Sequence, residues 1–342
     1  MSMLLRPPSG IVGAVEGTGI NYSPDGNGNY NITFYKDVQA LLSAGWLAAN
    51  QPNIFFVDGT NGLDSNIGTS PLFPFLTLTA AYNACTAGQN QIVYILPNTV
   101  HIGATFTWAK DKTHLIGLTA PIGQASRARF SATAVFTPMF NVTAQGCIFA
   151  NFEAFFGQTS AAGAAVCWLE QGQRNYYDTV HFAGGGDATQ AADASCRSLV
   201  IDGVSGQGEH FFNNCVFGLD TVAQVAASAT LEMLNHTPRN RFRDCEFANY
   251  TTANAPLFLK VGSGGIDRDV IFDRCIFRNS TVGGGTAMSQ AFSINSAAGG
   301  IFILKNSLVV GPTKLQTTDS ALVFGDNAYG AATTAKGLQL TW

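Results

Sequence analysis

A repeat of about 30 residues constrains this chain more than any other feature. The repeated unit is a six-residue pattern, aromatic-x-x-small-x-Phe, whose copies are Tyr177–Phe182, Phe212–Phe217, Phe242–Phe247, Phe272–Phe277 and a weaker Leu304–Val309. Successive copies end 35, 30, 30 and 32 residues apart. A second apolar segment precedes each copy and begins at Cys167, Leu199, Leu231, Leu257, Phe292 and Leu322. Because two interleaved patterns keep the same order, we interpret them as successive turns of one solenoid.

Short apolar segments separated by Gly, Asn, Ser and Thr turns indicate strands, so a period near 30 predicts a parallel β-helix. Each coil then contributes one strand to each of two or three parallel sheets, and the next coil lies about 4.8 Å further along the axis. Helical or leucine-rich solenoids would need amphipathic stretches of ten or more residues, whereas the segments between the strands are rich in Gly, Ala, Ser and Thr.

Stacked coils would place equivalent side chains above one another. We therefore expect Cys215, Cys245 and Cys275 to form an internal ladder of free thiols, because the coil spacing exceeds the roughly 3.5 to 4.5 Å between the Cβ atoms of a disulfide. A line of sulfurs does not offer the tetrahedron that zinc prefers, so we predict no metal there. Phe217, Phe247 and Phe277 would form an interior aromatic column.

The second and third residues of each pattern are predicted to face solvent at a corner. These are Arg243 and Asp244 in one coil and Asp273 and Arg274 in the next, so each Arg would face an Asp when the coils are in register. Exposed ion pairs are worth only about 0 to 1 kcal/mol each. We interpret them as markers of register.

The ends of the chain differ in composition from the repeats. We expect residues 51–325 to form the β-helix and residues 79–86 to form a short helix, capped by Thr79, that covers the first coil. Residues 1–50 contain turn-rich residues 23–29 and a helix candidate starting at Asp37, and they are predicted to be an attachment or oligomerisation arm. A flexible terminus is an equally open interpretation. Residues 326–342 form a Gly- and Ala-rich tail.

Charge and cysteine content exclude several classes of function. Only 12% of residues are charged, against about 25% in typical domains. With 18 basic and 22 acidic residues and no basic run, nucleic acid is an unfavourable partner. The first fifteen residues are interrupted by Arg6, Pro7, Pro8 and Gly10, so we expect no secretory signal, and no apolar segment suits membrane insertion. The seven Cys residues are expected to be reduced and buried.

Several segments resemble the pectate-lyase-like parallel β-helix superfamily, and in particular its bacteriophage virion members. They are Phe56–Asn66, Val93–Pro97, His114–Gly117, Tyr22–Gly26 and Asp37–Trp46. The resemblance implies a right-handed, single-stranded parallel β-helix and a homotrimer in the virion, used as a tailspike, head fibre or capsid decoration that contacts proteins such as the major capsid protein. The lyase clusters of Arg and Asp cannot be placed on this sequence, which disfavours lyase activity.

The sequence offers one candidate catalytic pair. Glu170 and Asp202 occupy what we align as equivalent positions in adjacent coils, and Glu232 lies one coil further. Two carboxyl groups about 5 to 5.5 Å apart suit a retaining glycosidase, although outward carboxylates are also ordinary solvated positions. The five His residues show no metal-ligand spacing, and Asp58–Asp64 lacks the terminal Glu of a calcium loop, so we expect no metal or cofactor.

The favoured hypothesis is a non-enzymatic structural protein of a phage particle, attached through the N-terminal arm. Two alternatives stay open. One is a tailspike-type polysaccharide depolymerase that uses outer-face carboxylates. The other is an adhesin that binds host surface glycan, which would need aromatic side chains exposed on its flank.

Overall fold

The structure is a computed structural model that describes residues 20–24, 30–34, 54–158, 165–280, 285–316 and 323–324. The chain divides into two compact units, Met1–Asn53 and Ile54–Trp342. In the first unit, β1 (Ile20–Pro24) pairs antiparallel with β2 (Tyr30–Phe34) across the turn-rich residues. The helix expected from Asp37, the rest of the predicted arm and the tail 326–342 lie outside the described residues.

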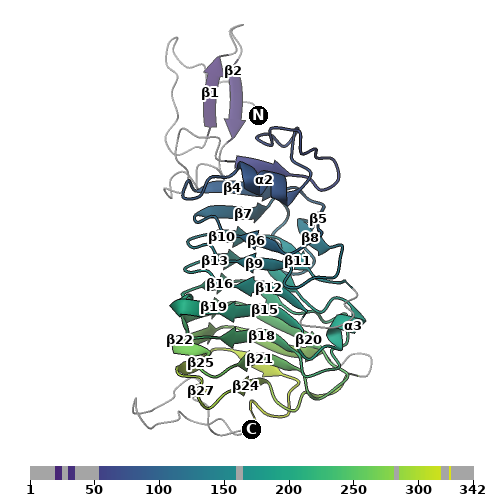
Figure 1. Ribbon diagram of the computed structural model, residues 1–342, viewed down its shortest axis with the longest axis vertical. Coiled ribbons are helices and arrows are strands. Elements are labelled where there is room, and N and C mark those ends of the chain that lie inside the picture. Colours follow the sequence, from purple (N-terminus) through teal and green to yellow (C-terminus); the bar gives the residue numbers. More distant parts are fainter. Residues whose placement is uncertain are drawn as a thin grey trace, which may run out of the picture. The chain divides into compact units, whose positions relative to one another are not determined.

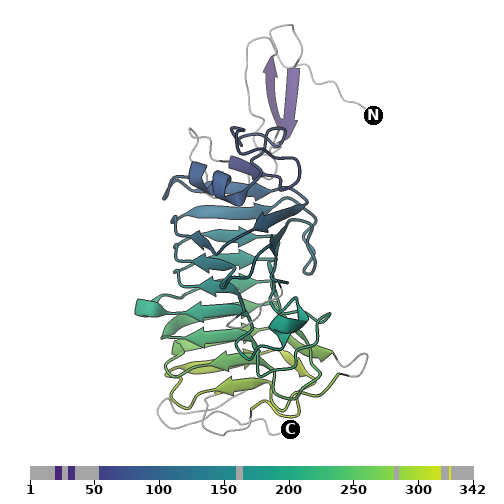
Figure 2. The same ribbon diagram turned by 45° about the vertical axis from the view of Figure 1, so that its right-hand side comes forward.

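The described part of the second unit contains three parallel sheets, which we call sheets I, II and III (Figures 1 and 2). Sheet I consists of β3 (Ile54–Val57), β4 (Gln91–Ile95), β7 (Thr113–Gly117), β10 (Ile148–Ala150), β13 (Tyr176–Asp178), β16 (Phe211–Asn213), β19 (Thr237–Arg243), β22 (Ile266–Asp273), β25 (Ile301–Lys305) and β27 (Val323–Phe324). Sheet II consists of β5 (Thr99–Ile102), β8 (Arg129–Ala132), β11 (Glu153–Phe155), β14 (His181–Ala183), β17 (Val216–Phe217), β20 (Glu246–Tyr250), β23 (Ile276–Ser280) and β26 (Leu308–Val310). Sheet III consists of β6 (Phe106–Trp108), β9 (Phe140–Val142), β12 (Val166–Glu170), β15 (Arg197–Asp202), β18 (Ala229–Leu234), β21 (Leu257–Val261) and β24 (Phe292–Ile294).

Each strand pairs with strands about one period away in the chain, which confirms the parallel β-helix. For example, β16 pairs in register with β13 on one side and β19 on the other. The chain passes from sheet I to sheet II to sheet III in every complete coil, so three short strands share about 30 residues.

A backbone corner separates sheet I from sheet II at the third position of each six-residue pattern. The residue at this position has a positive φ in six successive coils: Asn151 (58°), Thr179 (54°), Asn214 (53°), Asp244 (53°), Arg274 (55°) and Asn306 (48°). Asn and Asp tolerate this left-handed conformation better than most residues. The corner explains why the two flanking aromatic positions both face the interior despite their opposite parity.

The predicted column of Phe217, Phe247 and Phe277 is confirmed, and a second aromatic column, which was not predicted, lies beside it. Phe212, Phe242 and Phe272 stack with ring centroids 4.7 and 4.5 Å apart and nearly parallel planes. The column of Phe217, Phe247 and Phe277 has the same spacings. All seven Cys residues are free and buried, and Cys215, Cys245 and Cys275 occupy successive coils.

The alignment predicted for the second apolar segment is wrong in three coils. Trp168, not Cys167, pairs with Leu199, and Leu259, not Leu257, pairs with Leu231. Cys167 lies inside β12, one residue before Trp168; it is buried, and its thiol donates to the Ala154 carbonyl at 3.2 Å. Because Cys167 is apolar and buried although it alternates with the interior residues Trp168 and Glu170, its position in the strand cannot be assigned from hydrophobicity alone. The last copy, which contains β27, joins sheet I rather than sheet III.

One of the two predicted corner ion pairs forms. Arg274 donates two hydrogen bonds to Asp244, at 2.7 and 2.8 Å. The prediction that Arg243 pairs with Asp273 is wrong, although their backbones are in register. Arg243 turns toward the preceding coil, where its Nε donates to Asn213 at 3.1 Å and its guanidinium lies over the Phe211 ring. Asp273 accepts instead from Arg274 Nη1 at 3.3 Å and from Asn306 Nδ2 at 3.2 Å.

The predicted capping helix is α2 (Leu78–Ala84), at the N-terminal end of the stack (Figure 1). Its N-cap is Thr77 rather than Thr79, and the Thr77 hydroxyl accepts from the Ala80 N–H at 3.2 Å. Leu78 and Ala81 are buried, and Tyr82 packs on Trp108 of the first coils. Two short elements, α3 (Ala188–Ala191) and η1 (Val204–Gly206), lie in loops. None of the helices in the described residues is long and apolar enough to cross a membrane.

Candidate functional site

The predicted carboxylate pair does not form. Glu170 at the end of β12 pairs with Ile201, whereas Asp202 pairs with Leu234. Because side chains alternate along a strand, this one-residue offset places Glu170 and Asp202 on opposite faces of sheet III. The error follows from the alignment of Cys167 with Leu199. The geometry expected of a retaining glycosidase is therefore absent at these two residues.

Glu170 points into the interior of the coil and is fully buried. Its Oε1 accepts from the Gly172 N–H at 2.7 Å and from Asn175 Nδ2 at 3.1 Å, and its Oε2 accepts from the Tyr177 hydroxyl. Burial raises the pKa of Glu170 to about 8, against the lowering effect of these hydrogen bonds. Glu170 is therefore mostly protonated at neutral pH, in a position sealed from substrate.

His210 lies beside Glu170, with Nε2 3.7 Å from Oε1, and burial lowers its pKa to about 3. It belongs to an internal polar ladder with Asn175 and Asn240. Each member accepts the backbone N–H of the previous coil: Asn175 from Cys147, His210 from Asn175, and Asn240 from His210, at 2.8, 3.3 and 3.0 Å. The ladder therefore satisfies backbone donors that precede the strands of sheet I.

Asp202 and Glu232 are outside the core and are already engaged by neighbours. Asp202 accepts from Gln171 Nε2 at 3.1 Å and from Asn235 Nδ2 at 2.7 Å. Glu232 lies 2.8 Å from Arg197 Nε and 3.0 Å from Lys260 Nζ. Burial alone would raise the pKa of Glu232, but Arg197 and Lys260 outweigh it and hold the pKa below its ordinary value. Glu232 thus stays ionised and paired, which suits neither a general acid nor a free nucleophile.

An open groove of about 330 Å³ lies at the corner between sheets I and II. Its lining comprises Gly123, Asn214, Cys215, Val216, Asp244, Cys245, Glu246, Arg274 and Ile276. The two carboxylates in it are occupied, because Arg274 binds Asp244 and Arg278 Nε donates to Glu246. The hydrogen bonds from Arg274 hold the pKa of Asp244 below its ordinary value.

Sequence reasoning missed this groove because one wall comes from a distant coil. Gly123 belongs to the loop between β7 and β8, and an added Cβ there would lie 3.3 Å from Val216. The sequence repeat does show the column of corner residues Asn214, Asp244 and Arg274, and this column was the one part of the groove that could have been predicted. No periodicity predicts that a loop some 90 residues earlier lies over it.

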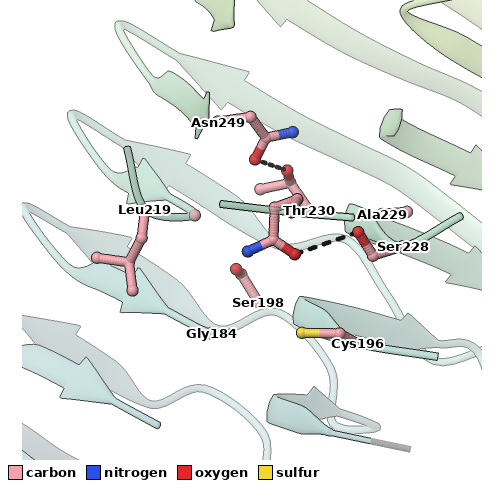
Figure 3. Close-up of a pocket in the computed structure, with 10 residues that line it drawn as sticks. Gly184, Cys196, Ser198, Leu219, Ser228, Ala229, Thr230 and Asn249 are labelled. Atoms are coloured by element: carbon pink, nitrogen blue, oxygen red, sulfur yellow. Dashed lines mark hydrogen bonds between the residues drawn. The ribbon is translucent and has the colours of Figure 1, made fainter. Parts of the chain in front are cut away.

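A second, smaller pocket lies between sheets II and III (Figure 3). Its polar walls are internally bonded: Thr230 donates to Asn249 at 2.8 Å and Ser228 to Gln224 at 3.3 Å. The space available to a water-sized sphere is about 10 Å³, which is near the minimum for a single water molecule. This pocket is too small for an organic ligand.

The described residues contain no group of three or more His, Cys, Asp or Glu side chains that could hold a metal ion. The acidic loop noted in the sequence uses its carboxylates internally. Asp58 accepts from the Thr60 and Asn61 N–H groups, both at 2.8 Å. Asp64 accepts from the Leu76 and Thr77 N–H groups, both at 2.9 Å.

No protein-family model matches the chain, and neither does any curated protein. Among solved structures, it is similar to a pectin methylesterase from Aspergillus niger (TM-score 0.46, 14% identity, 82% of this chain and 85% of that one). It is also similar to pectin methylesterase PemA from Erwinia chrysanthemi (0.42, 14%, 79% and 69%) and to ORF18 of Geobacillus virus E2 (0.27, 13%, 91% and 69%). At these identities the similarity concerns the β-helix fold alone.

Proposed function

We propose that this chain is a non-enzymatic structural protein of a phage particle, a homotrimeric capsid decoration or head fibre attached through residues 1–50. The observation that carries the proposal is the state of the carboxylates. Glu170, whose raised pKa would suit an acid catalyst, is sealed in the core, while Asp202 and Glu232 are held by neighbouring side chains. A stack of coils with a continuous aromatic interior suits a rigid structural role.

Two further features support a structural role. The chain divides into two units after Asn53, close to the predicted boundary of the arm, as expected of an attachment module to a partner such as the major capsid protein. The chain has only 12% charged residues, and a low charge allows close lateral packing of copies. Location in the virion follows from the same proposal.

A glycan-binding adhesin is the second candidate, because sheet I carries aromatic side chains on its outer face. Tyr176 and Phe211 are partly exposed in adjacent coils, with ring centroids 5.6 Å apart. Asp178, Asn213 and Arg243 line the same face and are joined by hydrogen bonds of 3.0 and 3.1 Å. Such a platform could stack against sugar rings without cleaving them.

Two measurements test the proposal. We expect the full-length protein to release no reducing ends from host polysaccharide, in contrast to a depolymerase. Release that disappears in the Asp244→Asn, Glu246→Gln variant would place chemistry in the groove and refute the non-enzymatic assignment. We also expect deletion of residues 1–50 to abolish incorporation into particles, whereas full incorporation of the truncated chain would refute attachment through the arm.

A further inference from the structure

The loop between β3 and α2 exposes an unusual concentration of large apolar side chains. Leu63, Ile67, Leu72, Phe73 and Leu76, which we call the loop patch, are between 37% and 81% exposed. They lie within fourteen residues of one connection at the N-terminal end of the coil stack (Figure 2). Single exposed apolar residues are normal on soluble proteins, but a concentrated group marks an interaction surface.

Hydrogen bonds hold the loop patch in a defined shape. The Leu63 N–H and the Asn66 side chain both donate to the Pro74 carbonyl, at 3.1 and 2.8 Å, and so join the two arms of the loop. The Asp64 carboxylate accepts from the Leu76 and Thr77 N–H groups and from the Thr77 hydroxyl. The exposure of these apolar side chains is therefore built into the loop.

Phe75 anchors the same loop in the core. It is buried, and its ring lies 6.3 Å from that of Phe55. Gly68 makes this possible, because its φ is 68° and an added Cβ would lie 2.0 Å from the Phe75 ring. Phe73 and Leu76, on either side of Phe75 in the sequence, are exposed. The same short segment therefore has one apolar side chain in the core and two on the surface.

The charge around the loop patch selects among partners. Between Ile54 and Cys85 the chain has no Lys or Arg, and its only acidic residues are Asp58 and Asp64. Asp58 is buried, and Asp64 bonds to the loop itself. An anionic lipid surface or a nucleic acid would require basic residues at the contact. A second copy of this chain brings another uncharged apolar surface, which meets the first without like-charge repulsion.

The size of the loop patch also fits association between copies. Its five side chains expose roughly 500 Å², which is comparable to the largest apolar patch on a typical monomer, about 300 to 600 Å² and often functional, and makes up more than half of the about 800 Å² per partner of a standard interface. Exposed Asn61, Ser65 and Thr69 supply the polar rim that interfaces have. We propose that the loop patch is the contact between copies of this chain at the N-terminal end of the β-helix.

This inference rests on the homotrimer in the proposed function, and sedimentation velocity on the full-length chain tests it. We expect the wild type to sediment as a trimer and the Leu72→Ser, Phe73→Ser variant to dissociate at concentrations at least about tenfold higher, because a tenfold shift in the midpoint of a monomer–trimer equilibrium requires only about 2.8 kcal/mol per trimer, less than about 1 kcal/mol per subunit. The matched control is Leu308→Ser, Val310→Ser, which removes two exposed apolar side chains of β26 and should leave the trimer intact. Unchanged circular dichroism and a cooperative thermal transition would establish that both variants are folded, although the variant that dissociates should melt at a lower temperature, because association stabilises the folded chain.

The remaining outcomes separate the two proposals. If the wild type and the Leu72→Ser, Phe73→Ser variant are equally stable trimers, the loop patch is not the contact and the homotrimer stands. If the wild type is a monomer at all concentrations, both the loop-patch contact and the homotrimer are refuted. If both variants dissociate equally, the inference is also overturned, because the effect is then not specific to this loop.

Discussion

The interior of the β-helix contains two regions that are stabilised in different ways. From β16 to β23 the interior repeats, with parallel Phe rings 4.5 to 4.7 Å apart in two columns. Around Glu170 it is polar, and Asn175, Tyr177 and His210 occupy it through specific hydrogen bonds. The repeating region is stabilised by identical contacts in each coil, so its sequence reveals it. The polar region is unique to a few coils and must satisfy each buried atom individually.

Tyr177 joins the two regions. Its ring continues the first aromatic column, with centroids 4.9 Å from Phe149 and 4.6 Å from Phe212. Its hydroxyl donates to Glu170 and accepts from Trp168 Nε1 at 3.2 Å. A Phe at this position would stack in the column equally well, so the contribution of the hydroxyl is its hydrogen bonds in the polar region.

The largest predicted effect comes from interrupting an aromatic column. Phe242 is almost fully buried between Phe212 and Phe272, so Phe242→Ala should lower the free energy of unfolding by about 3 to 5 kcal/mol. The control is Phe211→Ala, on the partly exposed outer face of the same sheet, which should cost much less. Denaturant titration measures both. Equal losses would mean that the interior column carries no special share of stability.

A pH series on Glu170→Gln tests the polar region. The pKa of Glu170 is about 8 in the folded protein and near 4.5 when unfolded, so the folded state holds a proton that the unfolded state releases between these values. The stability that this proton supplies is full below pH 4.5 and is lost as pH rises through 8. The free energy of unfolding of the Gln variant, measured relative to that of the wild type, should therefore rise by about 2 to 4 kcal/mol between pH 5 and pH 8.

The difference in unfolding free energy between the wild type and Glu170→Gln reports the titration of Glu170, because both proteins retain His210. The pKa of His210 is lowered, so its contribution is present above about pH 6.5 and is lost as pH falls, equally in both. Urea titrations at several pH values provide the comparison. A difference in unfolding free energy that does not change between pH 5 and pH 8 would contradict a protonated, buried Glu170.

The corner that separates the two aromatic columns should matter less than either interior region. Asn214 has a φ of 53°, a conformation that a β-branched residue adopts only at a cost of about 1 to 2 kcal/mol. Asn214→Val should be destabilised by about that amount relative to Asn214→Gly, which meets no steric cost there. Both variants lose the 3.1 Å bond from Asn214 to Thr179, so thermal unfolding of the pair reports the backbone alone. Equal melting temperatures would contradict this.

The same two regions explain what the sequence could and could not predict. Phe217, Phe247 and Phe277, and the thiols beside them, recur at a fixed period, so their stacking and burial followed from the pattern. Glu170 was placed on the outside because Cys167 looks like the start of a strand, and a one-residue error reverses every side chain that follows. The groove depends on Gly123, whose contact with Val216 is tertiary and has no periodic signal.

The smallest predicted effect concerns the exterior of the most regular coils. Arg274 and Asp244 form two good hydrogen bonds, but both side chains are about half exposed, so solvent and salt screen their attraction. We expect Arg274→Ala to lower the free energy of unfolding by less than about 1 kcal/mol, and Asp244→Asn to do no more. Added salt should remove most of the difference in unfolding free energy between the wild type and these variants, because it screens the ion pair that only the wild type has. A loss comparable to that of Phe242→Ala would show that the corner ion pair, and not the aromatic interior beneath it, holds successive coils in register.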